Sequence, residues 1–248
     1  SHPASGNSHD YNRLLWSGAL QLNFKSKFYL ILSGIFIASL VSSNLIFQKF
    51  FSWTPFGLYT FEISVGILPY PITFLVTDLI SEFYGKKKAD QLVITGLLSS
   101  VFVMGIIFIA DMAGSTSWSP VQNDTFHTVF GLYGPAVFAS MTAYLLAQFI
   151  DIRIFHFWKR ITKGKALWLR NNGSTIVSQL VDTTAVLLLL CIAGVIEWSR
   201  FTSLLENGFL FKVLIAILDT PIIYGIVYLL KGKIEIAPYE EGFVYEGS

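Results

Sequence analysis

Six long apolar stretches constrain the fold of this chain more than any other feature. Each spans about 20 residues, the length that an α-helix needs to cross the hydrocarbon core of a bilayer. Inside that core only helices and closed barrels satisfy their own backbone hydrogen bonds. The 248-residue chain is 53% hydrophobic and 13% charged, whereas soluble domains are about 25% charged. We therefore predict an all-α integral membrane bundle of six transmembrane helices, at about Phe28–Phe47, Thr60–Ile80, Gln91–Ala113, Gly134–Phe157, Ser174–Ile196 and Phe209–Leu230.

The basic residues predict how the spans are oriented. With the N-terminus in the cytoplasm, only Lys49, Arg200 and Lys212 of the 17 Lys and Arg residues fall on outside segments, and the other fourteen fall on cytoplasmic ones. Such an excess is the positive-inside bias of multi-pass membrane proteins. We therefore expect cytoplasmic tails at 1–27 and 231–248 around a transmembrane domain at 28–230.

Segments outside the spans carry weaker signals. The chain starts Ser-His-Pro-Ala-Ser-Gly without Met, which is typical of an expression-tag remnant or a trimmed tail. We expect no cleavable signal peptide, because the first apolar stretch is too long and follows about two dozen mixed residues. Residues 13–24 fit either a short amphipathic helix on the membrane surface or a flexible tail. Residues 114–133 are predicted to form an outer loop.

Five acidic residues lie inside or at the rim of the apolar stretches: Asp78, Glu82, Asp151, Asp182 and Asp219. A carboxylate at the centre of a bilayer costs about 3 kcal/mol on insertion scales, so such residues usually face the bundle interior and mark a functional site. Two of them recur as Gln148-x-x-Asp151 and Gln179-x-x-Asp182, and residues three apart share a helix face. The span topology places four of the five in the cytoplasmic half and Asp219 in the middle, so we expect one shared polar pocket.

The stretch from 174 to 196 carries the clearest polar stripe. Thr175, Ser178, Gln179 and Asp182 follow the i, i+3, i+4, i+7 spacing of one helix face. The run Arg170-Asn171-Asn172 precedes it, and helix capping explains one such residue but not three in succession. Asn44 adds an amide near the outer end of the first span.

Prolines interrupt two of the stretches. Pro69 and Pro71 fall inside the second stretch, and Pro221 follows Asp219 in the sixth. Because proline removes a backbone donor, we expect broken helices at these points. Broken helices in transporters often border the substrate site, and a plain structural kink is the alternative.

Surface ion pairs are alternative roles for two of the carboxylates. Glu82 is close in sequence to the basic run 86–88 and could pair with it at the membrane interface. Asp151 could likewise pair with Arg153 or Lys159.

Known catalytic patterns are missing. The chain has a single cysteine, Cys191, so it forms no internal disulfide and no cysteine metal cluster. We find no HExxH spacing, phosphate loop or nucleophile elbow, and expect no metal, no cofactor and no enzymatic activity. A polar pocket without catalytic groups favours a solute carrier. A membrane enzyme using Asp78 and Glu82 as acid and base is the competing class.

Three separated motifs resemble those of the queuosine precursor transporters within the vitamin uptake transporter family. They are Thr77-Asp78-Leu-Ile-Ser-Glu82-Phe-Tyr-Gly85, Ala147-Gln148-Phe-Ile-Asp151, and the segment from Arg170-Asn171-Asn172 to Gln179 and Asp182. The resemblance covers about residues 28–230. It implies a bacterial inner-membrane importer of 7-deazaguanine precursors of the tRNA base queuosine, similar in architecture to substrate-binding subunits of energy-coupling-factor transporters. The implied partners are the small molecule and the lipid bilayer, with no nucleic acid, and a homo-oligomer is one option.

The chemistry of a deazaguanine fits these residues. Its N1–H and N2–H₂ groups form a pair of donors for a carboxylate, and its O6 accepts from an amide. We take Phe74, Tyr84, Tyr144 and Trp168 as candidates for stacking on the ring. The predicted substrate-binding set is Asp78, Glu82, Gln148, Asp151, Arg170, Asn171, Asn172, Gln179, Asp182, Asp219 and Asn44. A carrier acting alone and a binding subunit needing a separate ATPase module both remain open.

Overall fold

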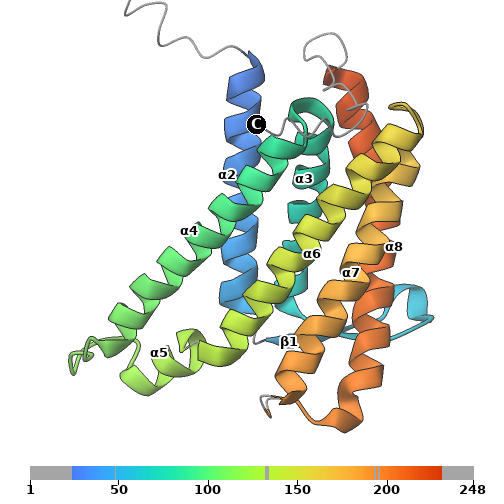
Figure 1. Ribbon diagram of the computed structural model, residues 1–248. Helices are drawn as coiled ribbons and strands as arrows, with labels where there is room; N and C mark the ends of the chain where they lie inside the picture. Colours follow the sequence, from blue (N-terminus) through green and yellow to red (C-terminus); the bar gives the residue numbers. More distant parts are fainter. Residues whose placement is uncertain (1–23, 48, 132–133, 193, 195, 231–248) are drawn as a thin grey trace, which may run out of the picture.

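The computed structural model describes residues 24–47, 49–131, 134–192, 194 and 196–230. Seven α-helices, three short 3₁₀ turns and one two-stranded sheet make up this part of the chain (Figure 1). The helices are α2 (Phe24–Ile46), α3 (Tyr70–Tyr84), α4 (Lys86–Met112), α5 (Asn123–Phe130), α6 (Gly134–Ile161), α7 (Leu167–Ile192) and α8 (Phe201–Leu230). The strands are β1 (Phe50–Trp53) and β2 (Phe61–Ser64), and the turns are η1 (Pro55–Gly57), η2 (Val65–Ile67) and η3 (Trp198–Arg200).

The six long helices run alternately up and down through one bundle (Figure 1). Five of the segments are long and apolar enough to cross a membrane. The remaining long helix, α6, has 28 residues and packs against α4 and α7. The prediction of an all-α membrane bundle is therefore confirmed, and the chain is a multi-pass membrane protein.

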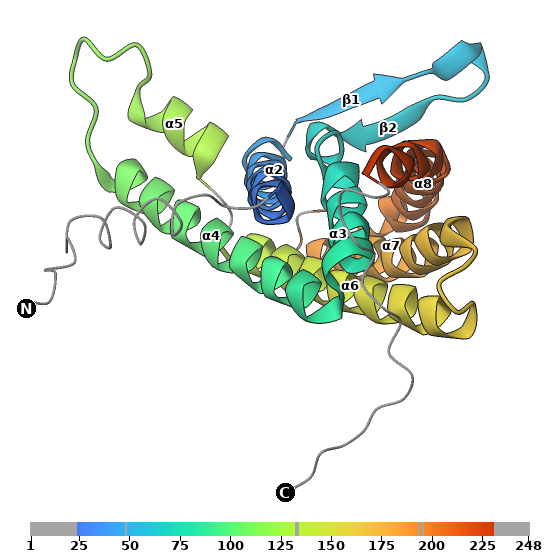
Figure 2. The same ribbon diagram turned by 90° about the horizontal axis from the view of Figure 1, so that it is seen from above.

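The two ends of the bundle differ in charge and structure. At one end, which we call the basic end, lie the start of α2, the α3–α4 turn, the α6–α7 turn and the last turn of α8 (Figure 1). Lys25, Lys86 and Arg160 lie there. The opposite end, which we call the hairpin end, carries the β1–β2 hairpin and α5, on different sides of the bundle (Figure 2).

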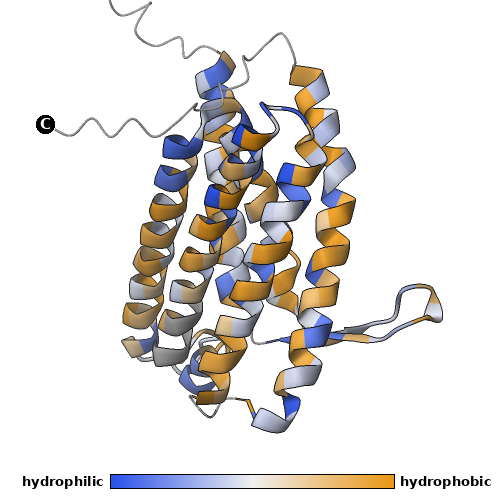
Figure 3. Ribbon diagram, turned by 45° about the vertical axis from the view of Figure 1, so that its right-hand side comes forward, coloured by the Kyte–Doolittle hydropathy of each residue, from blue (hydrophilic) through white to orange (hydrophobic). Residues whose placement is uncertain are grey.

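Hydrophobic residues predominate along the helices of the bundle (Figure 3). Large side chains such as Phe102, Phe108 and Leu229 are about 70% exposed, as expected where lipid rather than water covers a helix. The interior core includes Phe36, Phe83 and other fully buried residues from α2, α3, α4 and α6.

The second predicted span differs from the observed structure. Its first residues, around 60–64, form strand β2 rather than helix, and α3 begins only at Tyr70. Pro69 is the N-cap residue of α3 and Pro71 lies in its first turn. The expected mid-helix break is therefore wrong, because proline at a helix start removes a donor that has no intrahelical partner anyway.

Other expected irregular segments also contain regular structure. Pro221 lies inside α8, which continues as one helix on both sides, so the break expected there is wrong as well. The outer loop expected at 114–133 contains helix α5, where His127 Nδ1 contacts Asp111 Oδ2 at 2.6 Å. The predictions for the two tails and for residues 13–24 fall mainly outside the described residues.

Serine hydroxyls that donate to backbone carbonyls fix the hairpin and η2 to the end of α2. Strands β1 and β2 pair antiparallel, with Phe51 opposite Ile63. The Ser43 hydroxyl donates to the Gly66 carbonyl at 2.5 Å, and the Ser64 hydroxyl donates to the carbonyl of Phe47. These bonds hold β2 and η2 against α2.

Gly66→Ala is expected to destabilise this junction. A Cβ at Gly66 would lie 2.8 Å from the Ser43 carbonyl oxygen and 2.9 Å from Phe47 Cα, both backbone atoms that cannot rotate away. Forcing the backbones apart typically costs about 1–3 kcal/mol. Thermal unfolding in detergent measures the loss. Gly34→Ala is the matched control, because its Cβ would meet nothing within 4 Å, and an equal loss in both variants would contradict the expectation.

Candidate functional site

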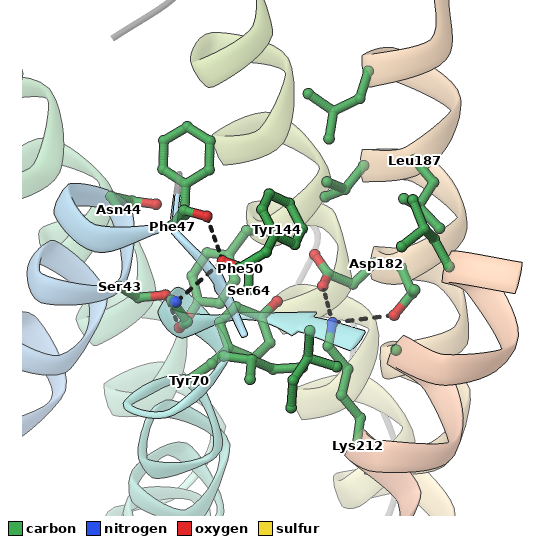
Figure 4. A pocket seen from close by; sticks show the side chains of 18 of the residues that line it. Ser43, Asn44, Phe47, Phe50, Ser64, Tyr70, Tyr144, Asp182, Leu187 and Lys212 are labelled. Carbon is green, nitrogen blue, oxygen red and sulfur yellow. Dashed lines mark hydrogen bonds and ion pairs between the residues drawn. The ribbon is translucent and has the colours of Figure 1, made fainter. Parts of the chain in front are cut away.

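A cavity that we call the large cavity lies at the hairpin end of the bundle. It encloses about 210 Å³ between α2, α3, α6, α7, α8 and the hairpin (Figure 4). Its walls are mostly apolar, with Phe47, Phe50 and Leu187 among them. Its polar side chains include Asn44, Tyr70, Tyr144, Asp182 and Lys212. A mostly apolar cleft with a few convergent polar groups is typical of a small-molecule site.

An ion pair between α7 and α8 forms one side of this cavity. Lys212 Nζ lies 2.7 Å from Asp182 Oδ2 and donates to Thr183 Oγ1 at 3.1 Å (Figure 4). The ammonium also lies 4.5 Å from the centroid of the Tyr70 ring. Both charged side chains are largely shielded, with 11% of Lys212 and 4% of Asp182 exposed.

Three buried polar atoms on the cavity wall have no hydrogen-bond partner among the described residues. They are Asn44 Nδ2, the Tyr70 hydroxyl and Asp182 Oδ1. The Tyr70 hydroxyl lies next to Asp182 but forms no well-shaped hydrogen bond with it. Because a buried polar group without a partner is costly, such groups are usually explained by a bound molecule or water. A donor, a hydroxyl and a carboxylate acceptor therefore face one cavity.

Aromatic rings beside these atoms offer flat surfaces. The Tyr70 and Tyr144 rings meet edge to face, with centroids 5.3 Å apart, and both line the cavity. Phe74 packs edge to face against Tyr144 from behind. Two of the aromatic candidates from the sequence lie elsewhere: Tyr84 donates to the Lys25 carbonyl at the basic end, and Trp168 is 55% exposed.

Gln148 lies behind Tyr144 in a buried polar network. Its Nε2 donates to the Tyr144 hydroxyl at 2.7 Å and to Thr73 Oγ1 at 3.4 Å. Its Oε1 accepts from Thr77 Oγ1 at 3.3 Å. Gln148 therefore orients a ring of the cavity wall rather than lining the cavity itself.

A second, very small cavity of about 10 Å³ continues from Tyr70 and Lys212 towards the basic end. Gln179 and Asp219 line it, together with Thr175. Gln179 is buried, and its Oε1 has no partner in the described part of the chain. The polar stripe predicted on α7 is confirmed, because Thr175, Ser178, Gln179 and Asp182 are all buried.

Asp78 and Asp151 form the next layer. They face one another between α3 and α6 and are 1% and 0% exposed. Asp151 Oδ1 accepts from the Ser178 hydroxyl at 3.0 Å, and neither oxygen of Asp78 has a well-shaped hydrogen bond with a described residue. The alternative in which Asp151 pairs with Arg153 or Lys159 is wrong: Arg153 lies 5.9 Å from the Phe149 ring and Lys159 binds elsewhere.

Glu82 holds two cations near the basic end. The two terminal nitrogens of Arg170 lie 2.9 and 3.1 Å from the carboxylate oxygens of Glu82. Lys159 Nζ lies 3.1 Å from the same carboxylate. All three side chains are at most 2% exposed. The alternative in which Glu82 pairs with the run 86–88 is wrong, because Lys86 binds Asp90. The cluster joins α3, α6 and α7.

The two asparagines of the Arg-Asn-Asn run point in different directions. Asn171 is buried in α7. Asn172 Nδ2 donates to Thr220 Oγ1 at 2.6 Å, which ties α7 to α8. Neither residue lines the large cavity.

The predicted residues thus lie in layers along the bundle rather than around one pocket. Only Asn44 and Asp182 of the eleven line the large cavity. Asp182 lies just past the middle of α7 towards the hairpin end, not in the half that contains Glu82. Sequence reasoning missed Tyr70 and Lys212. It assigned Lys212 to an outside segment, although a lysine within the apolar stretch 209–230 is itself a signal of a buried, paired charge.

The described residues contain no group of three or more His, Cys, Asp or Glu side chains that could hold a metal ion. The polar groups of the large cavity are carboxylate, amide, phenol, hydroxyl and ammonium groups. These groups bind and orient a polar molecule through hydrogen bonds and charge.

A bundle of membrane-crossing helices around a cavity with a few convergent polar groups is typical of membrane transport proteins. Residues 64–226 match the family model described as "Putative vitamin uptake transporter". The chain belongs to this vitamin uptake transporter family.

Two curated relatives carry the same name, "Probable queuosine precursor transporter". The protein from Bacillus subtilis is 29% identical over 175 residues, which are 68% of this chain and 73% of the relative. The protein from Haemophilus influenzae is 24% identical over 125 residues, half of each chain. No solved structure matches the chain.

Proposed function

We propose that this protein imports a 7-deazaguanine precursor of queuosine across the bacterial inner membrane. The names of the two relatives support this substrate class. The observation that carries the proposal is the set of three unpartnered buried atoms, Asn44 Nδ2, Tyr70 Oη and Asp182 Oδ1, around one cavity. They supply a donor and an acceptor on a surface that also offers aromatic rings.

The edge of a deazaguanine is complementary to these groups. One of its N1–H and N2–H₂ donors would bind Asp182 Oδ1, and its O6 would accept from the Asn44 amide. The ring would lie against Tyr70 or Tyr144, with aromatic contact adding to the affinity. The remaining predicted residues would then serve the path from this site to the basic end, where they lie in successive layers.

The proposal includes six spans and cytoplasmic termini. Basic residues gather at the end where α2 begins and α8 ends, which is the cytoplasmic side under the positive-inside rule. The cavity at the hairpin end would then open to the outside, as an importer needs for loading. Helix α6, with 28 residues, is long enough to be the sixth span.

The relatives are named as transporters, so we propose a carrier rather than a binding subunit of an ATPase-driven complex. We also propose no enzymatic activity. The carboxylates of the enzyme alternative, Asp78 and Glu82, do not line the large cavity where we place the ligand.

Uptake of labelled deazaguanines tests the proposal. Cells that lack their own synthesis and uptake of queuosine precursors are given the cyano or the aminomethyl form, with and without this chain. We expect expression of the chain alone to restore uptake and tRNA modification. Uptake at the level of empty cells would reject the proposed function, and uptake only with an added ATPase module would favour the binding-subunit alternative.

A further inference from the structure

Lys212 is a cation in an unusual position for a membrane helix. It lies on α8 among residues such as Phe211 and Ile215, and only 11% of its side chain is exposed. A charge at this depth is stable only with partners. Its ammonium donates to Asp182 and Thr183 and contacts the Tyr70 face, and these three partners all line the cavity.

The Asp182–Lys212 ion pair forms one side of the cavity, which we call its floor, and this floor carries no net charge. Asp182 from α7 and Lys212 from α8 cancel, and α2, α3 and α6 line the cavity without an ionisable acid or base other than tyrosine. Glu62 on β2 also lines the cavity, but its side chain is exposed at the hairpin, where water screens its charge. Asp219 on α8 borders the small cavity behind Lys212 instead.

The pair also fixes which oxygen meets a ligand. Lys212 holds Asp182 Oδ2, while Oδ1 has no partner among the described residues. A ligand donor therefore meets one oxygen of a carboxylate whose charge is already balanced. A neutral donor edge gains a hydrogen bond there, whereas a cationic group gains little attraction from Asp182 because it also feels the Lys212 ammonium.

We propose that Lys212 sets the charge preference of the site, so that the cavity favours a neutral deazaguanine over one with a cationic side group. The proposal rests on the proposed function and names a residue that determines specificity within it. Lys212 does so by balancing the charge of Asp182, which lowers the attraction of the cavity for a cationic ligand.

The test compares the affinity of purified protein for the neutral cyano-deazaguanine and the cationic aminomethyl-deazaguanine. The first variant is K212Q, whose amide can still donate to Asp182 but carries no charge. The second is K212R, which keeps the charge. The third is the double variant D182N/K212Q, which removes both charges and so restores a neutral floor.

We expect K212Q to shift the affinity ratio by about tenfold or more towards the cationic ligand, because the attraction of a nearby cation to an uncompensated carboxylate exceeds a tenfold change in affinity at a protein dielectric of about 20. K212R and D182N/K212Q are expected to keep the ratio of the unmodified protein, although the double variant binds both ligands more weakly. A general loss of folding would lower both affinities alike and leave the ratio unchanged.

An unchanged ratio in K212Q, or an equal shift in K212R, would overturn the role of Lys212. Failure of the unmodified protein to bind either deazaguanine would instead reject the proposed function. The two failures are thus separate results of one set of measurements.

Discussion

Replacing Asp182 by Asn is expected to weaken deazaguanine binding by roughly 10- to 100-fold, since a hydrogen bond to a charged group contributes about 1.5–3 kcal/mol. Asp182 Oδ1 is the buried acceptor that faces the cavity, and Oδ2 holds Lys212. An Asn that keeps its oxygen on Lys212 turns its NH₂ towards the donors of the ligand. Isothermal titration with purified protein measures the loss.

The matched control for this prediction is Asp111→Asn. The Asp111 carboxylate also has a close nitrogen partner, His127 Nδ1 at 2.6 Å, but it lies on α4 at the contact with α5 and does not line the cavity. Its replacement should leave ligand affinity within about twofold, the usual range for a surface change. Equal losses in both variants would show that Asp182 has no special role in binding.

Glu82→Gln is expected to lower the free energy of unfolding by about 3–5 kcal/mol, the cost typical of removing one partner from a buried ion pair. The substitution leaves Lys159 and Arg170 at most 2% exposed with a neutral amide between them. Neither cation can reach water without moving α6 or α7. Denaturant unfolding in detergent micelles measures the change.

Asp90→Asn provides the comparison for Glu82. It removes a carboxylate from an ion pair of similar length, Lys86–Asp90 at 2.8 Å, but this pair is 25–30% exposed. Partly exposed pairs one helix turn apart are worth about 0.5 kcal/mol. Similar losses at both positions would mean that burial does not determine the strength of the Glu82 cluster.

These two predictions separate residues that look alike in the sequence. Asp182 and Glu82 are both acidic residues on predicted spans. Glu82 contacts two cations and does not line the large cavity, whereas Asp182 contacts one cation and keeps one oxygen without a partner among the described residues. The first arrangement mainly joins helices, whereas the second leaves an acceptor for a ligand.

The polar face of α7 was predictable because helix periodicity is local. Residues spaced i, i+3, i+4 and i+7 share a face whatever surrounds the helix. The four residues with that spacing, Thr175, Ser178, Gln179 and Asp182, are all buried. The starts of helices were harder to predict. Pro69 and Pro71 have the same local chemistry at a helix start and at a mid-helix break. The residues before them pair as strand β2 with β1 and then form η2, so α3 begins only at Tyr70.

The partners of the charges could not be predicted from the sequence. Glu82 meets Arg170 and Lys159 from two other helices, although Lys86 is only four residues away. Lys212 was read as an outside residue, yet it pairs with Asp182 across α7 and α8. Sequence distance does not determine such pairs, because a buried charge takes the partner that the packing of neighbouring helices presents.

The sequence by itself determined the membrane class, the helical bundle and the inward polar stripe of α7, because hydrophobic length and helical period are local properties of the chain. Only the tertiary structure decided that the acidic residues form separate layers and that Asn44, Tyr70 and Asp182 face one cavity with Lys212. Those relations depend on the rotation and depth of one helix against another. The positions at which side chains from different helices meet exist only after the bundle has packed.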